Sequence, residues 1–167
     1  ADEMVGSYDT DTKVNPPLRG MDDINALRQG LVDGTVDCIA TDHAPHDWES
    51  KDCEYDLASY GISGLETAVA AVMDGLVKQG LLELNQMVEL FTLGPADVLG
   101  LDRGTLDVGA DADLTIIDPS LSKAVDPSQF YSKGKNTPFK GKILQGWPCM
   151  TIVKGRIVAR DGKIVED

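Results

Sequence analysis

The stretch that decides the fold is residues 36–46, VDCIATDHAPH, which holds both histidines of the chain. Its first part, residues 36–40, is short and mostly apolar, as in a buried strand of a parallel sheet. Asp42, His43 and His46 follow this segment, and α/β barrels carry catalytic side chains at that end of a strand. A carboxylate and imidazoles can bind a metal or move protons. The same letters also fit a solvated turn in which Asp42 caps backbone amides, so the pattern alone leaves both interpretations open.

The residues around this stretch alternate between helical patterns and loops. Apolar residues recur at helical spacing in residues 22–33 and 65–78, and a shorter helix is expected from about residue 85 to residue 92. Residues 47–60 are charged and aperiodic, which predicts a solvated loop of the kind that covers active sites. Residues 1–100 therefore look like strand–helix units of an α/β protein, with too few strands to close a barrel.

The remainder of the chain, residues 101–167, is rich in strand and turn patterns. LTIID at residues 114–118 is an apolar strand candidate, and the end of the chain alternates strand patterns with KG at 154–155 and DG at 161–162. These dipeptides indicate tight turns between paired strands. We therefore expect a domain boundary near residue 100, with strand–helix units before it and a β-rich segment after it.

The composition excludes several classes of partner. The chain carries 28 acidic and 15 basic residues, a formal charge of −13, whereas nucleic acids and anionic membranes need a cationic surface. No apolar run approaches the ~20 residues that span a bilayer, and residues 1–13 do not resemble a signal peptide. The three cysteines form no CxxC motif, which fits the reduced thiols of a cytoplasmic protein.

The motif and four further segments resemble one enzyme family. Residues 37–46, DCIATDHAPH, resemble the last barrel strand of bacterial-type dihydroorotases, which belong to the cyclic amidohydrolase superfamily. DHAPH together with KVNPPLR at residues 13–19 is more similar to dihydroorotases than to hydantoinases, dihydropyrimidinases or allantoinases. The other similar segments are YDTDTKVNPPLR (8–19), YGISGLET (60–67), GTLDVGADADLTIID (104–118) and NTPFKGKILQG (136–146) followed by TIVKGRIV (151–158).

This resemblance implies a chemistry and a role for five residues. Dihydroorotases interconvert N-carbamoyl-L-aspartate and L-dihydroorotate in pyrimidine synthesis, and one or two zinc ions activate the attacking water. Asp42 matches the aspartate that contacts the metal and shuttles the proton between water and the leaving nitrogen. His46 matches the histidine that holds the substrate carboxylate, and Asn15 matches an asparagine that hydrogen-bonds the substrate. Gly61 and Ile62 lie where the loop backbone is expected to meet the pyrimidine ring.

The sequence also departs from the family. The HxH pair, the bridging lysine and two later histidines of a complete dihydroorotase have no counterpart here. The resemblance therefore implies the C-terminal part of an amidohydrolase TIM barrel, followed by a β-rich segment of the accessory β-sandwich domain. A catalytic zinc takes three protein ligands, so we expect this chain alone to bind zinc weakly and to be inactive. His43 is expected to orient its neighbours rather than to bind metal.

Three alternatives concern the activity and the partners. The parent could be another cyclic amidohydrolase that resembles hydantoinases or allantoinases. It could also be a non-catalytic dihydroorotase-like subunit that scaffolds aspartate transcarbamoylase. Finally, the helical apolar stripes would lack their covering strands, so the chain could associate with further copies of itself through that exposed face.

Overall fold

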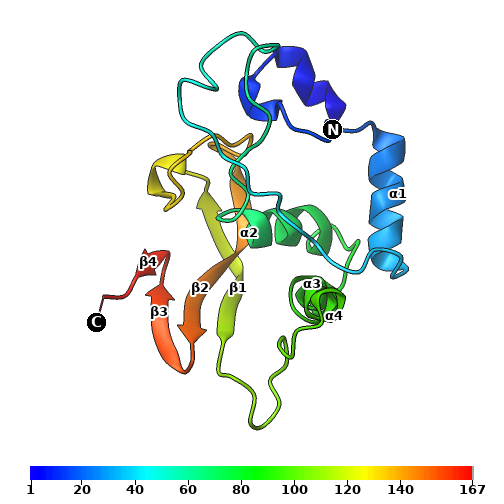
Figure 1. The fold of residues 1–167 in the computed structure, drawn as a ribbon. Coiled ribbons are helices and arrows are strands. Elements are labelled where there is room, and N and C mark those ends of the chain that lie inside the picture. Colours follow the sequence, from blue (N-terminus) through cyan, green and yellow to red (C-terminus); the bar gives the residue numbers. More distant parts are fainter. Residues whose placement is uncertain (167) are drawn as a thin grey trace. The chain divides into compact units, whose positions relative to one another are not determined.

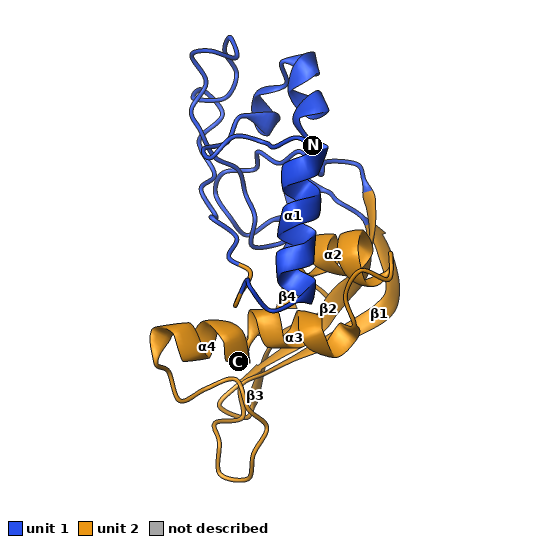
Figure 2. Cartoon of the chain, turned by 90° about the vertical axis from the view of Figure 1, so that its right-hand side faces the viewer, with its two compact units in different colours: residues 1–36, 40–68, 124–142 blue, residues 37–39, 69–123, 143–167 orange. Residues whose placement is uncertain are grey.

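The computed structural model describes residues 1–166, and their contacts divide them into two compact units that interleave along the chain (Figure 2). Unit 1 is made of residues 1–36, 40–68 and 124–142, and unit 2 of residues 37–39, 69–123 and those from 143 onward. Among the described residues, no helix combines the length and the apolar character that a membrane crossing requires.

Unit 1 consists mainly of loops, with one regular helix. This helix, α1 (Met21–Val32), begins one residue before the predicted segment and ends one residue earlier. Two aspartates in its first turn favour the positive end of the helix dipole. Gly30 is its one buried residue, and in the predicted apolar stripe Leu27 and Val32 are exposed while Ile24 and Leu31 are half-buried. The short 3₁₀ helices of this unit are η1 (Asp2–Ser7), η2 (Thr10–Thr12) and η4 (Pro127–Gln129).

The strand predicted for residues 36–40 is wrong. This segment has no strand hydrogen bonding, and the motif makes only an isolated parallel bridge between His43 and Ile62. A strand exists only where a neighbouring strand pairs with its backbone. The Ile39 amide instead donates to the Leu90 carbonyl at 3.0 Å. The apolar residues Val36, Cys38 and Ile39 are half-buried, but the segment forms no ladder.

Unit 2 contains the other helices. The predicted helix 65–78 appears as α2 (Ala68–Val72), which continues into a π-helical turn, η3 (Met73–Val77). The predicted helix 85–92 is α3 (Leu84–Phe91), followed at once by α4 (Leu93–Leu99). A capping box starts α3, in which the Gln86 side chain accepts the Glu83 amide at 3.0 Å. The buried apolar residues of this unit are Ala70, Met73, Leu82, Met87, Leu90, Ala96 and Leu144.

A four-stranded sheet completes unit 2, and Figure 1 shows its strands from yellow-green β1 to red β4. The strands are β1 (Leu114–Ala124), β2 (Ile143–Val153), β3 (Arg156–Arg160) and β4 (Lys163–Ile164), in the order β1-β2-β3-β4. Strand β3 pairs antiparallel with both β2 and β4. Both residues of each predicted turn, KG at 154–155 and DG at 161–162, have positive φ, as two-residue hairpin turns require. These turn predictions are confirmed.

Candidate functional site

Three loop segments of unit 1 meet around the DHAPH motif. They are residues 41–46, residues 61–66 and residues 132–136. The Ala44 amide donates to the Ile62 carbonyl at 3.0 Å, which joins the first two segments. Asn136 joins all three, since its side-chain oxygen accepts the His46 amide at 2.9 Å and its carbonyl accepts the Ser63 amide at 2.8 Å. The candidate site is thus built by hydrogen bonds between loops.

Asp42 is exposed and has a left-handed backbone, with φ at 43°. Aspartate tolerates this region better than most residues, and strained backbones of this kind cluster at functional sites. Its carboxylate has no hydrogen-bond or ion-pair partner among residues 1–166. It therefore caps no amide in this part of the chain, which removes the interpretation of the motif as a capped turn. The strained position presents a free carboxylate.

His46 is half-buried, and its ring is oriented by the backbone. The Nε2 atom lies 2.8 Å from the Tyr60 carbonyl oxygen, which can only accept, so Nε2 carries a hydrogen and donates it. The Nδ1 atom has no partner among the described residues. The ring therefore has one nitrogen fixed by the protein and one available for a ligand.

Gly61 occupies a position that only glycine fits. Its φ is 125°, and a Cβ there would lie 2.3 Å from the Ala44 carbonyl oxygen. Its amide donates to the Lys13 carbonyl at 3.0 Å, and its carbonyl accepts from Asn136 Nδ2 at 2.8 Å and Lys51 Nζ at 3.2 Å. A backbone bond from Gly61 to a substrate would therefore have to replace one of these bonds.

The remaining predicted residues lie close by in sequence or space. Ile62 is half-buried beside the motif through its bonds to residues 43–44. Asn15 is exposed and lies two residues after Lys13, whose carbonyl holds Gly61. The structure thus brings Asp42, His46, Gly61 and Ile62 together, whereas no contact of the described residues ties the Asn15 side chain to them.

Two buried lysines, which the sequence did not indicate, hold the loop of residues 47–60. Lys51 is 5% exposed, and its ammonium donates to the Ser59 and Gly61 carbonyls at 2.9 and 3.2 Å. Lys13 is 6% exposed, and its ammonium donates to the Asp56 carbonyl at 2.8 Å and lies 4.5 Å from the Tyr60 ring centroid. Burial lowers the pKa of Lys51. The expectation of a simply solvated loop is therefore wrong at Lys51.

His43 belongs to a second set of contacts that the sequence did not indicate. Its Nδ1 atom accepts the Gly64 and Leu65 amides, each at 3.1 Å. Its Nε2 atom lies 3.2 Å from the Ser132 hydroxyl, and the Ser132 amide and hydroxyl both donate to Glu66. The sequence signal for this set is that residues 37–46 and 60–67, which contain His43, Gly64, Leu65 and Glu66, resemble the same family, whereas Ser132 lies outside every such segment.

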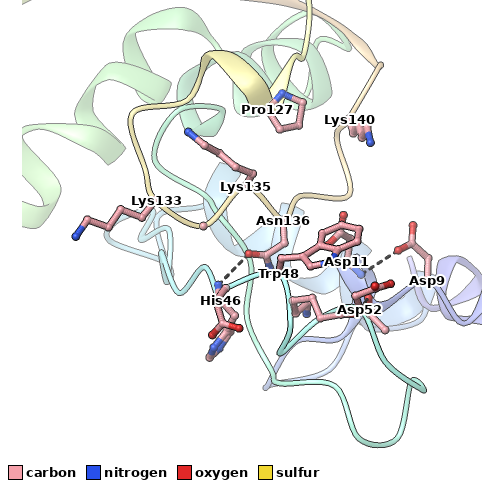
Figure 3. A pocket seen from close by; sticks show the side chains of 14 residues that line it. Asp9, Asp11, His46, Trp48, Asp52, Pro127, Lys133, Lys135, Asn136 and Lys140 are labelled. Carbon is pink, nitrogen blue, oxygen red and sulfur yellow. Dashed lines mark hydrogen bonds between the residues drawn. The ribbon is translucent and has the colours of Figure 1, made fainter.

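A cavity of about 400 Å³ lies within unit 1, next to His46 (Figure 3). Figure 3 labels His46, Trp48, Lys135 and Asn136 among the lining residues and marks the hydrogen bond between His46 and Asn136. Burial, and then the charge of Asp9, raises the pKa of Asp11, which also lines this cavity. His46 is the only predicted site residue in its wall, so the cavity adjoins the motif without including Asp42.

The side chains of residues 1–166 do not amount to a complete metal site. This part of the chain has no group of three or more histidine, cysteine, aspartate or glutamate side chains that could hold a metal. A catalytic zinc takes three protein ligands. Asp42 fits one of them, because its carboxylate is exposed and free. The described residues therefore offer one ligand of such a site, the carboxylate of Asp42.

Comparison with known proteins supplies the context for this site. Residues 14–158 match the amidohydrolase family. Over 160 residues the chain is 61% identical to a dihydroorotase of Pelotomaculum thermopropionicum, and over 161 residues it is 50% identical to a dihydroorotase of Geobacter sp.. These matches cover 96% of this chain, but the chain spans only about 38% of the length of those relatives.

Solved structures agree with this family. An L-hydantoinase from Arthrobacter aurescens matches 99% of this chain and 38% of its own, with a TM-score of 0.92 and 34% identity. A D-hydantoinase from Thermus sp. matches 95% of this chain and 36% of its own, with a TM-score of 0.85 and 28% identity. The predicted fold class, part of an amidohydrolase barrel followed by a β-rich segment, is confirmed. The chain belongs to the amidohydrolase family.

Proposed function

We propose that this chain supplies the proton-transfer and substrate-binding residues of a zinc-dependent dihydroorotase. The observation that carries the proposal is Asp42, an unpartnered carboxylate on a left-handed backbone within the DHAPH motif. Identities of 50–61% to dihydroorotases support this substrate, against 34% or less to the two hydantoinases. The proposed reaction is the reversible cyclisation of N-carbamoyl-L-aspartate to L-dihydroorotate.

The proposed role of Asp42 follows from its chemistry. An unpartnered carboxylate can take a proton from a water molecule and return it to the ring nitrogen that leaves when the amide opens. Because its backbone is fixed by the bonds of residues 43–44 to Ile62, the carboxylate needs little reorganisation for this transfer. A bound zinc ion, with Asp42 as one ligand, would polarise the amide carbonyl and acidify the water.

The substrate is proposed to bind on the side of the motif that holds His46. Its Nδ1 atom is available, and when both ring nitrogens carry hydrogen the imidazolium donates from Nδ1 to the carboxylate of dihydroorotate. Asn15 is proposed to hydrogen-bond the same substrate, and Gly61 and Ile62 to face the pyrimidine ring. For Gly61 this contact is proposed through its Cα, because the protein already uses its amide and carbonyl.

Several broader features are part of this proposal. Residues 1–100 would contribute the last strand–helix units of a barrel, and residues 101–167 part of the accessory β domain. The other metal ligands would come from outside these 167 residues, so the isolated chain would be inactive. We further propose a cytoplasmic protein, since its cysteines are free in the described residues, and assembly with copies of itself or with aspartate transcarbamoylase.

One observation favours a second candidate. The solved structures named above are hydantoinases, which favours a hydrolase that opens a neutral ring. The identities of 50–61% to dihydroorotases weigh against this candidate, because they exceed the 34% or less to the two hydantoinases. A non-catalytic scaffold subunit is the weakest candidate, since such a protein has no need for the strained backbone of Asp42.

A chimaera tests the proposal. This chain would replace the matching 160 residues of the Pelotomaculum thermopropionicum dihydroorotase, and the product would be assayed with dihydroorotate, hydantoin, dihydrouracil and allantoin. We expect dihydroorotate to be the preferred substrate and His46→Ala to raise its KM. A preference for a neutral ring would contradict the proposed substrate, and an inactive but folded, metal-loaded chimaera would contradict the proposed activity.

A further inference from the structure

His43 directly follows the proposed proton shuttle, yet both of its ring nitrogens already have partners in the protein. The Nδ1 atom lies 3.1 Å from the backbone nitrogens of Gly64 and Leu65. The Nε2 atom lies 3.2 Å from the hydroxyl of Ser132. The ring is therefore bonded to two segments that are distant from it in sequence.

These partners fix the positions of the hydrogens without ambiguity. A backbone amide can only donate, so Nδ1 accepts from Gly64 and Leu65 and carries no hydrogen. The hydrogen of the ring then lies on Nε2 and is donated to Ser132 Oγ. The Ser132 hydroxyl passes its own hydrogen to Glu66 Oε1, which also accepts the Ser132 amide at 2.8 Å. The donor in each of these bonds is therefore fixed by the two backbone amides that donate to Nδ1.

Glu66, at the end of this series of hydrogen bonds, is itself held by further bonds. The other carboxylate oxygen of Glu66 accepts the Ser63 hydroxyl at 3.1 Å, and Ser63 is 1% exposed. The Ser63 amide in turn donates to the Asn136 carbonyl, while Asn136 holds Gly61 and His46. This series of hydrogen bonds therefore connects the same three loop segments that build the site.

We propose that His43 is a positioning residue, which Ser132 and Glu66 hold as the Nε2–H tautomer so that it orients Asp42 and the loop of residues 61–65. The inference deepens the proposed function and rests on it, because Asp42 is the group that His43 positions. His43 neither binds the metal nor moves a proton. Each of those roles would require a ring nitrogen that the protein already uses.

Variants in the chimaera separate positioning from metal binding. Ser132→Ala removes the acceptor of Nε2–H and leaves the ring in place, and we expect kcat/KM to fall about 10–100-fold with unchanged bound metal. Ser128→Ala is the control, because this serine is exposed and lies outside the chain of bonds. If Ser132→Ala behaves like Ser128→Ala, the proposed role of the chain of bonds is wrong.

Two replacements of His43 sharpen the test. Asparagine can place its side-chain oxygen near the Nδ1 position and accept the two loop amides, whereas phenylalanine accepts neither. We therefore expect His43→Asn to keep more of kcat than His43→Phe, with both variants retaining wild-type metal content. Loss of metal from both variants, with rates restored by added zinc, would show that His43 is a ligand and would overturn the inference.

The tautomer offers a readout that does not depend on activity. Nitrogen-15 labelling of histidines in the chimaera, with the His43 signals assigned by their loss in His43→Asn, reports which ring nitrogen carries hydrogen. We expect only the Nε2–H form, and a mixture of tautomers in Ser132→Ala. An inactive chimaera with a single tautomer counts against the proposed function, whereas an active chimaera with mixed tautomers counts against the positioning role alone.

Discussion

The sheet of unit 2 and the loop site of unit 1 reach order in different ways. In the sheet, β2, β3 and β4 are neighbours in sequence and are joined by two-residue turns. In the site, the hydrogen bonds between His43 and Ser132 and between Ser132 and Glu66 join residues 89 and 66 positions apart. Local turn chemistry specifies the pairing of β2, β3 and β4, whereas side chains from distant segments specify the site. The two regions should therefore respond differently to substitution.

Each unit contains one tryptophan, which lets the two regions be monitored separately. Trp48 lies in unit 1 and Trp147 in unit 2. Replacing one of them by phenylalanine leaves a fluorescence probe for the other unit during urea unfolding.

Gly61→Ala is expected to have the largest effect. Its Cβ would lie 2.3 Å from the Ala44 carbonyl oxygen, at a φ of 125° that alanine rarely adopts. Strain and overlap of this kind cost roughly 3 kcal/mol or more. The Trp48 transition should move to much lower urea, while the Trp147 transition moves less. Equal shifts in both probes would show that the two units unfold together.

Lys51→Met is expected to follow. The buried ammonium is the donor to the Ser59 carbonyl, and methionine would leave that acceptor without it at a cost of about 1–3 kcal/mol. Lys78→Met is the matched control, because its ion pair with Asp74 is exposed and contributes about 1 kcal/mol or less. If the two variants unfold at the same urea concentration, Lys51 does not stabilise the loop.

Glu66→Gln is expected to have a pH-dependent effect. Burial raises the pKa of Glu66, but hydrogen bonds from Ser132 and Ser63 outweigh it and hold the pKa below the ordinary value of 4.5. A lowered pKa stabilises the folded state above pH 4.5, and this contribution is lost as pH falls through the folded pKa. The stability difference from wild type should therefore be full at pH 6 and shrink toward pH 3. A constant difference would contradict this assignment.

Gly155→Ala is expected to have the smallest effect. This glycine has a φ of 78°, but a Cβ there would meet nothing within 4 Å. The cost is that of a left-handed alanine, about 1 kcal/mol, and only the Trp147 probe should report it. A larger loss than that of Gly61→Ala would reverse the comparison between the two regions.

The same comparison explains what could be predicted from the sequence. Helical periodicity located α1 and α3, and KG and DG located the hairpin turns, because these signals act between near neighbours. The strand predicted at residues 36–40 is absent because a strand needs a neighbouring strand, and the sequence of the segment does not specify one.

The candidate site was likewise predictable only where its signals lie close together in sequence. Resemblance to a family predicted roles for Asp42 and His46, because both residues lie in a short motif. The buried Lys51 and the contacts of Ser132 with His43 and Glu66 escaped prediction, since they depend on residues brought together only by folding. A charged residue in a polar loop carries no local sign that it will be buried.

The central claim is that Asp42 shuttles the proton in dihydroorotate ring opening. Asp42→Asn in the chimaera tests it most directly, because asparagine tolerates the left-handed backbone but cannot accept the proton. Asp37→Asn, at an exposed position, is the control. The account predicts that kcat falls about 10²–10⁴-fold in Asp42→Asn and stays unchanged in Asp37→Asn. An undiminished kcat in a folded Asp42→Asn chimaera would contradict the account.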